Sequence, residues 1–234
     1  MLQLAVAGVV LAGVVIAGLR RRGTLQRAIS QRGWGYLERD DERASTWTMP
    51  PFAYLRAPGD PEIEIQRDVE VSEVVTFAES GSTALSMAVT EVHRSGTEVI
   101  REITYHVVAL HTRQGLPRTI ARSGIDVYVL PGYEGLERVR EPVLRTRTGL
   151  LAILSEDPST ARTVPFERVA RDLGIDARVT VVTDGDWIYA YRPGRPSLHR
   201  IDTMITTVQK LARGIRPTRW PGPENPSSYV YGAV

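Results

Sequence analysis

Four histidines are the residues of this chain best suited to hold a metal ion, and they stand at positions 93, 106, 111 and 199. No two of them have the i, i+4 spacing that places both imidazoles on one face of a helix, and the chain has no cysteine to add a thiolate. His93 and His106 fall within stretches that alternate like β-strands. We therefore expect sheet or surface histidines and no metal-binding residue.

Sequence motifs of the common enzyme classes are absent. The chain has no G-x-x-x-x-G-K-[ST], no G-x-G-x-x-G, no G-x-S-x-G and no H-E-x-x-H. The acids Glu38, Asp40, Asp41 and Glu42 could pair for acid-base chemistry, but neighbouring acids in a polar connector are usually a solvated surface. We predict no catalytic residue and no cofactor, although a site assembled from residues distant in the sequence stays open.

The tripeptide Asp184-Gly185-Asp186 fits two structures. A calcium loop carries acids at this spacing, but the other ligands and the distal glutamate are missing. Asp-Gly is also a strong turn signal, so we predict a hairpin between strands at 178–183 and 187–191. The aromatic residues Trp187, Tyr189 and Tyr191 alternate at period two and should share one face of the second strand. Core packing is the more common role for such a row than a binding platform.

The first part of the chain is strongly apolar, since every residue from Leu4 to Leu19 is Leu, Ala, Val, Ile or Gly. A helix over residues 1–19 would rise roughly 28 Å, close to the thickness of a bilayer core of about 30 Å. We predict a transmembrane helix at 1–19. A cleaved export signal would have positive charge before the apolar run and a small-residue cleavage site after it, and this segment has neither feature. A buried core helix would have a polar face, which this segment also lacks.

Arginines that follow the apolar run predict its orientation. The expected membrane-surface residues are Arg20, Arg21, Arg22 and Arg27. The positive-inside rule then places the N-terminus outside the plasma (inner) membrane and the rest of the chain in the cytoplasm. Four small residues have the spacing that lets two membrane helices approach closely, which predicts a possible homo-oligomer: Gly8, Ala12, Gly13 and Ala17.

The remainder divides into three parts. Residues 20–33 should form a basic juxtamembrane helix that ends at a glycine, 34–216 a single cytoplasmic α+β domain, and 217–234 a Pro-rich disordered tail. Trp34 and Tyr36, at the start of the domain, are our candidate contacts for a partner. The net charge of +2 comes from arginines spread among acids, so we predict no nucleic-acid partner.

Periodicity within the domain predicts a mainly antiparallel sheet with helices packed on one face. Stretches with strand character lie at 69–77, 85–91, 98–110, 125–130 and 150–154, and short turns separate the first three. A helix is expected from Asp157 to about Leu173. A second should begin after Ser197, since its apolar residues from Leu198 to Ile215 recur at helical spacing.

The order of these features resembles a family of uncharacterised single-pass membrane proteins of high-GC bacteria. The residues that carry the resemblance are Gly33-Trp34-Gly35-Tyr36, Glu38-Arg39-Asp40-Asp41, the strand from Tyr105 to Leu110, and Gly185-Asp186-Trp187 through Gly194. The family pattern W-x-Y-x-E-x-D-D is thus present. The resemblance implies an architecture and no activity, and it does not extend to residues 50–61 or to the tail.

From these features we expect a membrane-anchored, non-enzymatic cytoplasmic domain. It would bind a membrane or cytoplasmic protein partner or help to assemble a membrane complex, with the lipid bilayer as its other contact. The alternative is a membrane-tethered hydrolase or small-ligand-binding domain whose site is not visible as a sequence motif.

Overall fold

The computed structural model describes residues 23–40, 42, 47, 49, 51–52, 65–79, 81–123, 135–139, 144–146, 149–161, 166 and 179–214. The helix predicted at 1–19, the arginines at 20–22, the strand predicted at 125–130 and the tail at 217–234 lie outside these residues. Within the described ranges, no helix has the length and apolar character needed to cross a membrane.

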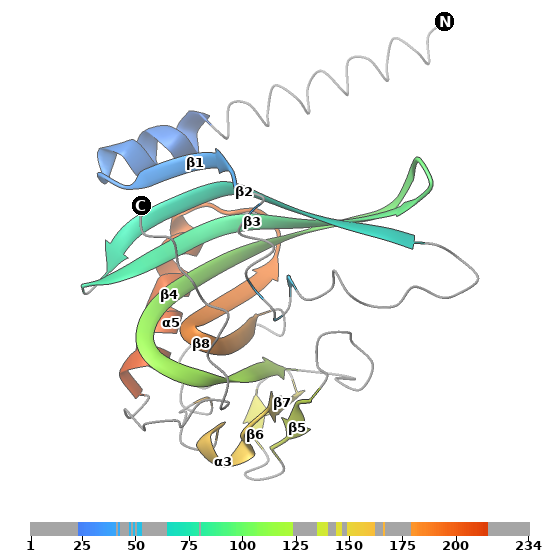
Figure 1. The fold of residues 1–234 in the computed structure, drawn as a ribbon. Coiled ribbons are helices and arrows are strands. Elements are labelled where there is room, and N and C mark those ends of the chain that lie inside the picture. Colours follow the sequence, from blue (N-terminus) through green and yellow to red (C-terminus); the bar gives the residue numbers. More distant parts are fainter. Residues whose placement is uncertain are drawn as a thin grey trace, which may run out of the picture.

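The described elements form an α+β fold, as the sequence predicted (Figure 1). The strands are β1 (Gly35–Arg39), β2 (Ile65–Glu79), β3 (Ser82–Ser95), β4 (Glu98–Ser123), β5 (Glu137–Arg138), β6 (Leu144–Thr146), β7 (Gly149–Ser155) and β8 (Thr180–Pro193). The helices are residues 23–31, α3 (Pro158–Ala161) and α5 (Leu198–Gly214). Of the helix predicted at 157–173, the described part is α3 and Phe166.

One eight-stranded sheet contains all the described strands, and every pairing in it is antiparallel. Its order runs β1-β2-β3-β4-β7-β5, with β8 on β4 and β6 on β7. β3 pairs with the first half of β4, up to Leu110, and β7 pairs with its end, from Thr119. β4 therefore continues from one part of the sheet into the other, and Figure 1 shows it curling strongly between them.

The hairpin predicted at residues 184–186 is wrong, because β8 passes through this tripeptide as a single strand. β8 follows β4 from Tyr105 to Arg122, and the register shifts on both sides of the Leu116–Gly185 pair. Gly185 has φ +56°, and the side chain of Asp186 accepts a hydrogen bond from the Gly115 N–H at 2.9 Å. The turn-forming residues therefore bend two paired strands together instead of reversing the chain.

The sheet has an apolar core on each face. On β3, Ala84 belongs to the core that contains the helices, and Leu85 and Met87 belong to the core on the opposite face. This opposite core also includes Trp47, Met49 and Phe52, which are at most 9% exposed. The aromatic row of β8 packs in this opposite core, as the sequence predicted. Tyr189 is fully buried, and its ring centroid is 4.8 Å from that of Trp47.

The helix of residues 23–31 and α5 pack into the same core, so both lie on one face of the sheet. α5 begins directly after Ser197, whose carbonyl accepts the Ile201 N–H at 2.9 Å. Five of its six buried residues belong to the predicted apolar stripe: Ile201, Met204, Ile205, Val208 and Leu211; Thr207 is the sixth. Leu25 and Ile29 bury the corresponding side of the first helix.

Candidate interaction surface

Trp34 and Tyr36, our candidate partner contacts, are half-buried against the helix-side core. Gly33 ends the preceding helix with φ +68°, and the Trp34 ring then stacks on Phe77 with centroids 4.5 Å apart. The Arg32 guanidinium lies 4.7 Å from the Trp34 ring. The two aromatics thus join the first helix and β1 to the sheet, while their proposed contact with a partner stays a prediction.

Of the four predicted membrane-surface arginines, Arg27 is the one within the described residues, and it is exposed on the helix of residues 23–31. Leu25 and Ile29, on the other side of this helix, are buried in the domain. The apolar side of the helix is therefore occupied by the sheet, and an arginine remains on the outer side. This arrangement leaves Arg27 available for a contact outside the domain.

A serine and a histidine meet on the helix-covered face of the sheet, in the arrangement that a hydrolase would need. Ser86 Oγ lies 3.0 Å from His106 Nε2, on neighbouring strands β3 and β4. Both residues are fully buried. A substrate could not reach this hydroxyl without moving the layer that covers it, so a buried structural hydrogen bond accounts for the pair.

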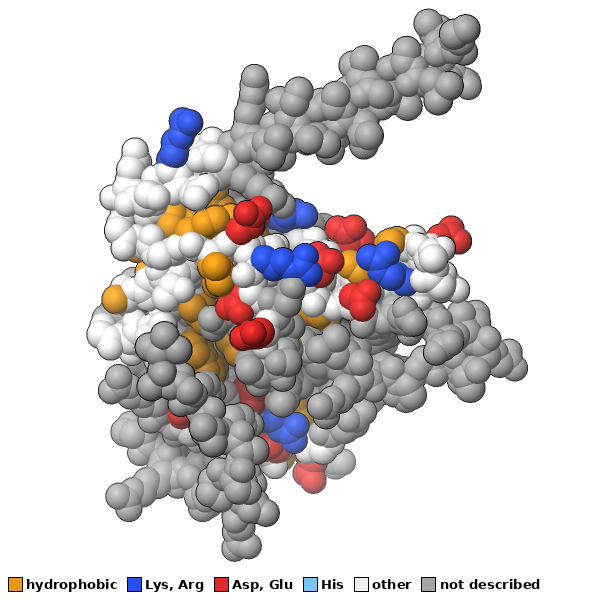
Figure 2. Space-filling model, turned by 45° about the horizontal axis from the view of Figure 1, so that its top comes forward, with side chains coloured by type: hydrophobic (Ala, Val, Ile, Leu, Met, Phe, Trp, Pro, Cys, Tyr) orange, Lys and Arg blue, Asp and Glu red, His pale blue; other side chains and the backbone are white. Residues whose placement is uncertain are grey.

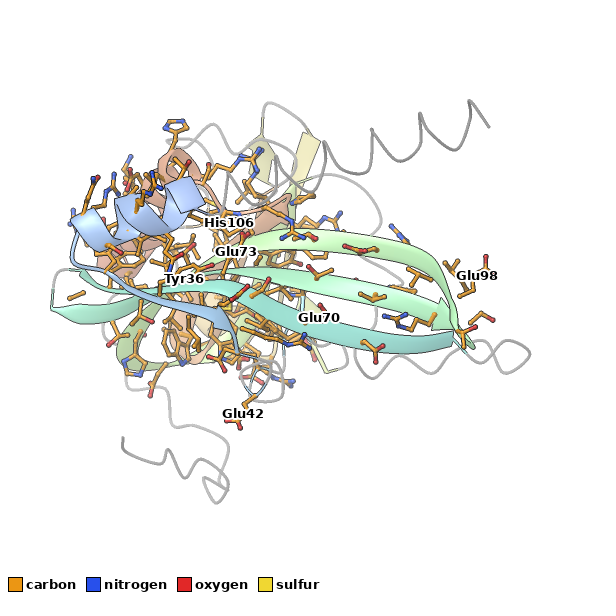
Figure 3. All side chains as sticks on the ribbon, turned by 90° about the horizontal axis from the view of Figure 1, so that it is seen from above. Tyr36, Glu42, Glu70, Glu73, Glu98 and His106 are labelled. Atoms are coloured by element: carbon orange, nitrogen blue, oxygen red, sulfur yellow. The ribbon has the colours of Figure 1, made fainter. Side chains whose placement is uncertain are left out.

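A buried acid lies nearby. Glu73 is 2% exposed, and its φ of +52° is unusual for a residue other than glycine. It occupies the irregularity where β2 loses register with β3, between Ser72 and Val75. Its Oε1 is 3.6 Å from Arg195 Nη1, in the connection between β8 and α5. Figure 3 shows Glu73 and His106 in the central part of the sheet, far from the end at which Glu98 lies.

The other histidines do not gather around a common centre. His93 Nε2 lies 2.7 Å from Glu91 Oε1, His111 packs edge-on against Trp187 with centroids 4.9 Å apart, and His199 is exposed on α5. No group of three metal-ligating side chains occurs among the described residues. Of the acids at 38–42, Glu38 and Glu42 are exposed, and Asp41 lies outside the described residues.

The β3–β4 hairpin projects from the body of the sheet in Figure 1, and the start of β2 pairs along β3 as far as Ser95. Residues 95–102, around its turn, are all exposed. They include Val99 (45% exposed) and Ile100 (56% exposed). Arg94 pairs with Val99 and His93 with Arg101, so Ile100 is an extra residue that interrupts the alternation of the ribbon.

Charged side chains surround this apolar pair. Arg94 forms an ion pair with Asp68 at 3.2 Å, and Glu98, Arg101 and Glu102 are exposed on the same hairpin. Figure 2 shows acidic, basic and hydrophobic side chains interleaved on the face it displays. An apolar contact with a rim of both charge signs is the usual composition of a protein-protein interface. We take the hairpin end, residues 94–102, as the candidate interaction surface and call it the arm tip.

Sequence patterns predicted neither the arm tip nor Leu37, the other exposed large hydrophobic residue of the described chain. Val99 and Ile100 occur in a stretch with ordinary strand periodicity, and nothing in that pattern predicts that their side chains are exposed. The turn signal at Ser95-Gly96 did place the hairpin correctly, since β3 ends at Ser95 and β4 begins at Glu98.

Comparison with known proteins identifies a fold and no family. No family model matches the chain, and no curated protein sequence does. The chain is similar to the crystal structure of the mycobacterial trehalose monomycolate transport factor A, TtfA, with a TM-score of 0.57 and 16% identity. The match covers 85% of this chain and 96% of that chain. At this identity the similarity shows a shared fold, and it runs through nearly all of TtfA.

Proposed function

From this shared fold we propose that the chain is a membrane-tethered, non-enzymatic domain that binds a protein partner within a complex that transports a lipid of the cell envelope. The observation that carries the proposal is the extent of the similarity, which takes in 96% of a transport factor rather than one common motif. Fold likeness alone transfers no activity, so the proposal also draws on the chain's own surface.

The arm tip supports a binding role. A hairpin that projects from the sheet and exposes Val99 and Ile100 places apolar area where a partner can cover it. The surrounding charges, with Arg94, Arg101 and Glu102 among them, would orient the partner. We assign the partner contact to this surface.

The buried Ser86–His106 pair supports the non-enzymatic part of the proposal. A catalytic serine must contact its substrate, and here both members of the pair are fully buried. The hydrolase alternative would require the layer that buries this pair to move. A binding domain needs no such movement.

The membrane tether is proposed from the sequence. The apolar run at 1–19 would anchor the chain, with its N-terminus outside and the domain on the cytoplasmic side, and Arg20, Arg21, Arg22 and Arg27 would lie at the lipid head groups. In the structure, Arg27 is exposed and the buried side of its helix joins the domain. The domain would therefore sit close to the membrane surface.

Affinity capture tests the proposal. The tagged full chain would be solubilised from membranes of its native host in mild detergent and purified with whatever it holds. We expect a membrane protein of a lipid-transport system in stoichiometric amount. Repeated recovery of the chain alone, from membranes in which it is abundant, would contradict the proposed function.

A further inference from the structure

The outer sides of the two longer helices carry a basic surface. The helix of residues 23–31 and α5 pack into one core on one face of the sheet, and in Figure 1 both lie at the end of the sheet away from the projecting hairpin. The exposed charges on these helices, counted with Arg32 directly after the first one, are four basic residues and one acid. The basic residues are Arg27, Arg32, Lys210 and Arg213, and the acid is Asp202. We call this surface the basic face.

Positive charge is concentrated on the basic face. Asp202 is bound to Arg32 through both carboxylate oxygens, at 2.7 and 3.0 Å, and this ion pair joins the two helices. Four basic residues and one acid give the face a net charge of +3, larger than the +2 of the whole chain. The rest of the chain is therefore negative on balance.

α5 contributes one continuous outward stripe to this face. Its exposed positions recur at helical spacing: His199, Asp202, Thr203, Thr206, Lys210 and Arg213. The hydroxyls of Thr203 and Thr206 each donate a hydrogen bond of 2.8 Å to a carbonyl of their own helix, four residues earlier. The middle of the stripe therefore leaves no hydroxyl donor unsatisfied when another surface covers it.

The chain before the first helix brings the basic face close to the bilayer. The predicted span ends at residue 19 and the helix begins at residue 23, so the three arginines at 20–22 are the whole connection. Such a connection reaches about 14 Å at full extension. With the proposed tether in place, the start of this helix stays within that distance of the lipid head groups. Figure 3 shows Glu98, on the arm tip, at the other end of the sheet.

We propose that the basic face lies against an anionic membrane surface, with Arg27, Lys210 and Arg213 at the lipid phosphates. The inference rests on the proposed tether and adds α5 as a second contact with lipid. Basic clusters directly beside a membrane span are typical of binding to anionic lipids, and each Lys or Arg near such a surface strengthens adsorption roughly fivefold. Contact through both helices would fix the orientation of the domain, which an anchor at one point would leave free to rotate.

Fluorescence quenching in lipid nanodiscs tests the contact. The chain has no cysteine, so Thr206→Cys in the full chain takes a thiol-reactive fluorophore at the middle of the α5 stripe. The discs contain phosphatidylcholine alone or mixed with anionic phosphatidylglycerol, and a lipid with a nitroxide on its head group is the quencher. Ile100→Cys is labelled as the control, because Ile100 is exposed on the arm tip. We expect stronger quenching at residue 206 than at residue 100, and a clear loss of this difference without the anionic lipid.

Charge variants separate recognition of lipid charge from simple proximity. Lys210→Gln together with Arg213→Gln removes two positive charges from the basic face and should weaken adsorption about 25-fold, with loss of most of the quenching at residue 206. Arg101→Glu lowers the net charge by the same amount on the arm tip and is the control for this lipid contact, since the discs hold no protein partner. Added salt should reduce the quenching as the glutamine changes do.

The failures are distinguishable. A chain that does not stay with the discs during purification would contradict the tether, and this inference with it. A chain that stays with the discs but shows equal quenching at residues 206 and 100 would overturn the lipid contact alone and would favour an acidic protein surface as the occupant. Quenching that persists in phosphatidylcholine alone and after the glutamine changes would overturn the role of anionic lipid.

Discussion

Arg32 and Asp202, 170 residues apart, form a bidentate ion pair between the end of the first helix and α5. Arg32 Nη1 lies 2.7 Å from Asp202 Oδ1, and Nη2 lies 3.0 Å from Oδ2. The hydrogen bond to Asp202, with the opposite charge of that carboxylate, raises the pKa of Arg32. The segment that follows the predicted anchor is thereby attached to the last helix of the domain.

A double-mutant cycle measures this pair. Both side chains are more than a third exposed, so we expect Arg32→Ala and Asp202→Ala to be coupled by only about 0.2–1 kcal/mol in the free energy of unfolding. Added salt should weaken the coupling. A raised arginine pKa contributes stability that is lost only as pH rises through that pKa, so urea unfolding between pH 7 and 9 should show no loss from Arg32. Loss of the coupling between pH 7 and 9 would contradict the ion pair between Arg32 and Asp202.

The Ser86–His106 hydrogen bond should matter for stability. Ser86→Ala leaves a fully buried His106 nitrogen without this 3.0 Å partner, at a cost of about 1–3 kcal/mol. Ser95→Ala, at the exposed end of the same strand, is the control and should change the free energy of unfolding little. Denaturant unfolding of both variants makes the comparison, and equal effects would show that the buried pair carries no special weight.

Gly185 should be required for the bend in β8. At φ +56° a side chain is strained, so Gly185→Ala should cost roughly 1–2 kcal/mol although no atom lies within 4 Å of the added Cβ. Gly23→Ala is the control, because that glycine has the same open space in a helix and no positive φ. Thermal unfolding separates the two. Equal stability of the two variants would argue against a positive φ at Gly185.

The proposed orientation has a separate test. Proteolysis of sealed inner-membrane vesicles should degrade the domain when the cytoplasmic face is outward and spare it when that face is inward. Reversing the charge of the arginines at 20–22 to glutamate should reduce this asymmetry, since these residues orient the predicted span. A domain digested only from the opposite face would contradict the cytoplasmic location.

Local patterns were sufficient to predict much of the fold. The alternation in residues 69–110 predicted three strands with two tight turns, and the apolar stripe after Ser197 predicted α5, because these patterns follow from burial of one face. The hairpin predicted at 184–186 was wrong because a glycine with positive φ occurs in a bend of paired strands as well as in a hairpin turn. Only the position of β4 beside β8 decides between the two.

The candidate surfaces could not be predicted in the same way. Val99, Ile100 and Leu37 have the sequence character of ordinary strand residues, and their exposure depends on how the strands are placed in the sheet. The Ser86–His106 contact likewise arises from the register of β3 on β4. Trp34 stood out in the sequence, and the structure places it on Phe77, where it contributes to packing.

Capture of the partner by arm-tip variants tests the central claim most directly. The full chain, a Val99→Ser, Ile100→Ser double variant and a Leu37→Ser control would be tagged, expressed at equal levels and recovered from solubilised membranes of the native host. Loss of two buried apolar contacts should lower partner recovery about tenfold or more, since each such contact contributes on the order of 1 kcal/mol. The control should retain the partner, because Leu37 lies on the β1 edge. Undiminished recovery with the double variant would contradict the assignment of the arm tip, and no partner with any of the three would contradict the proposed function itself.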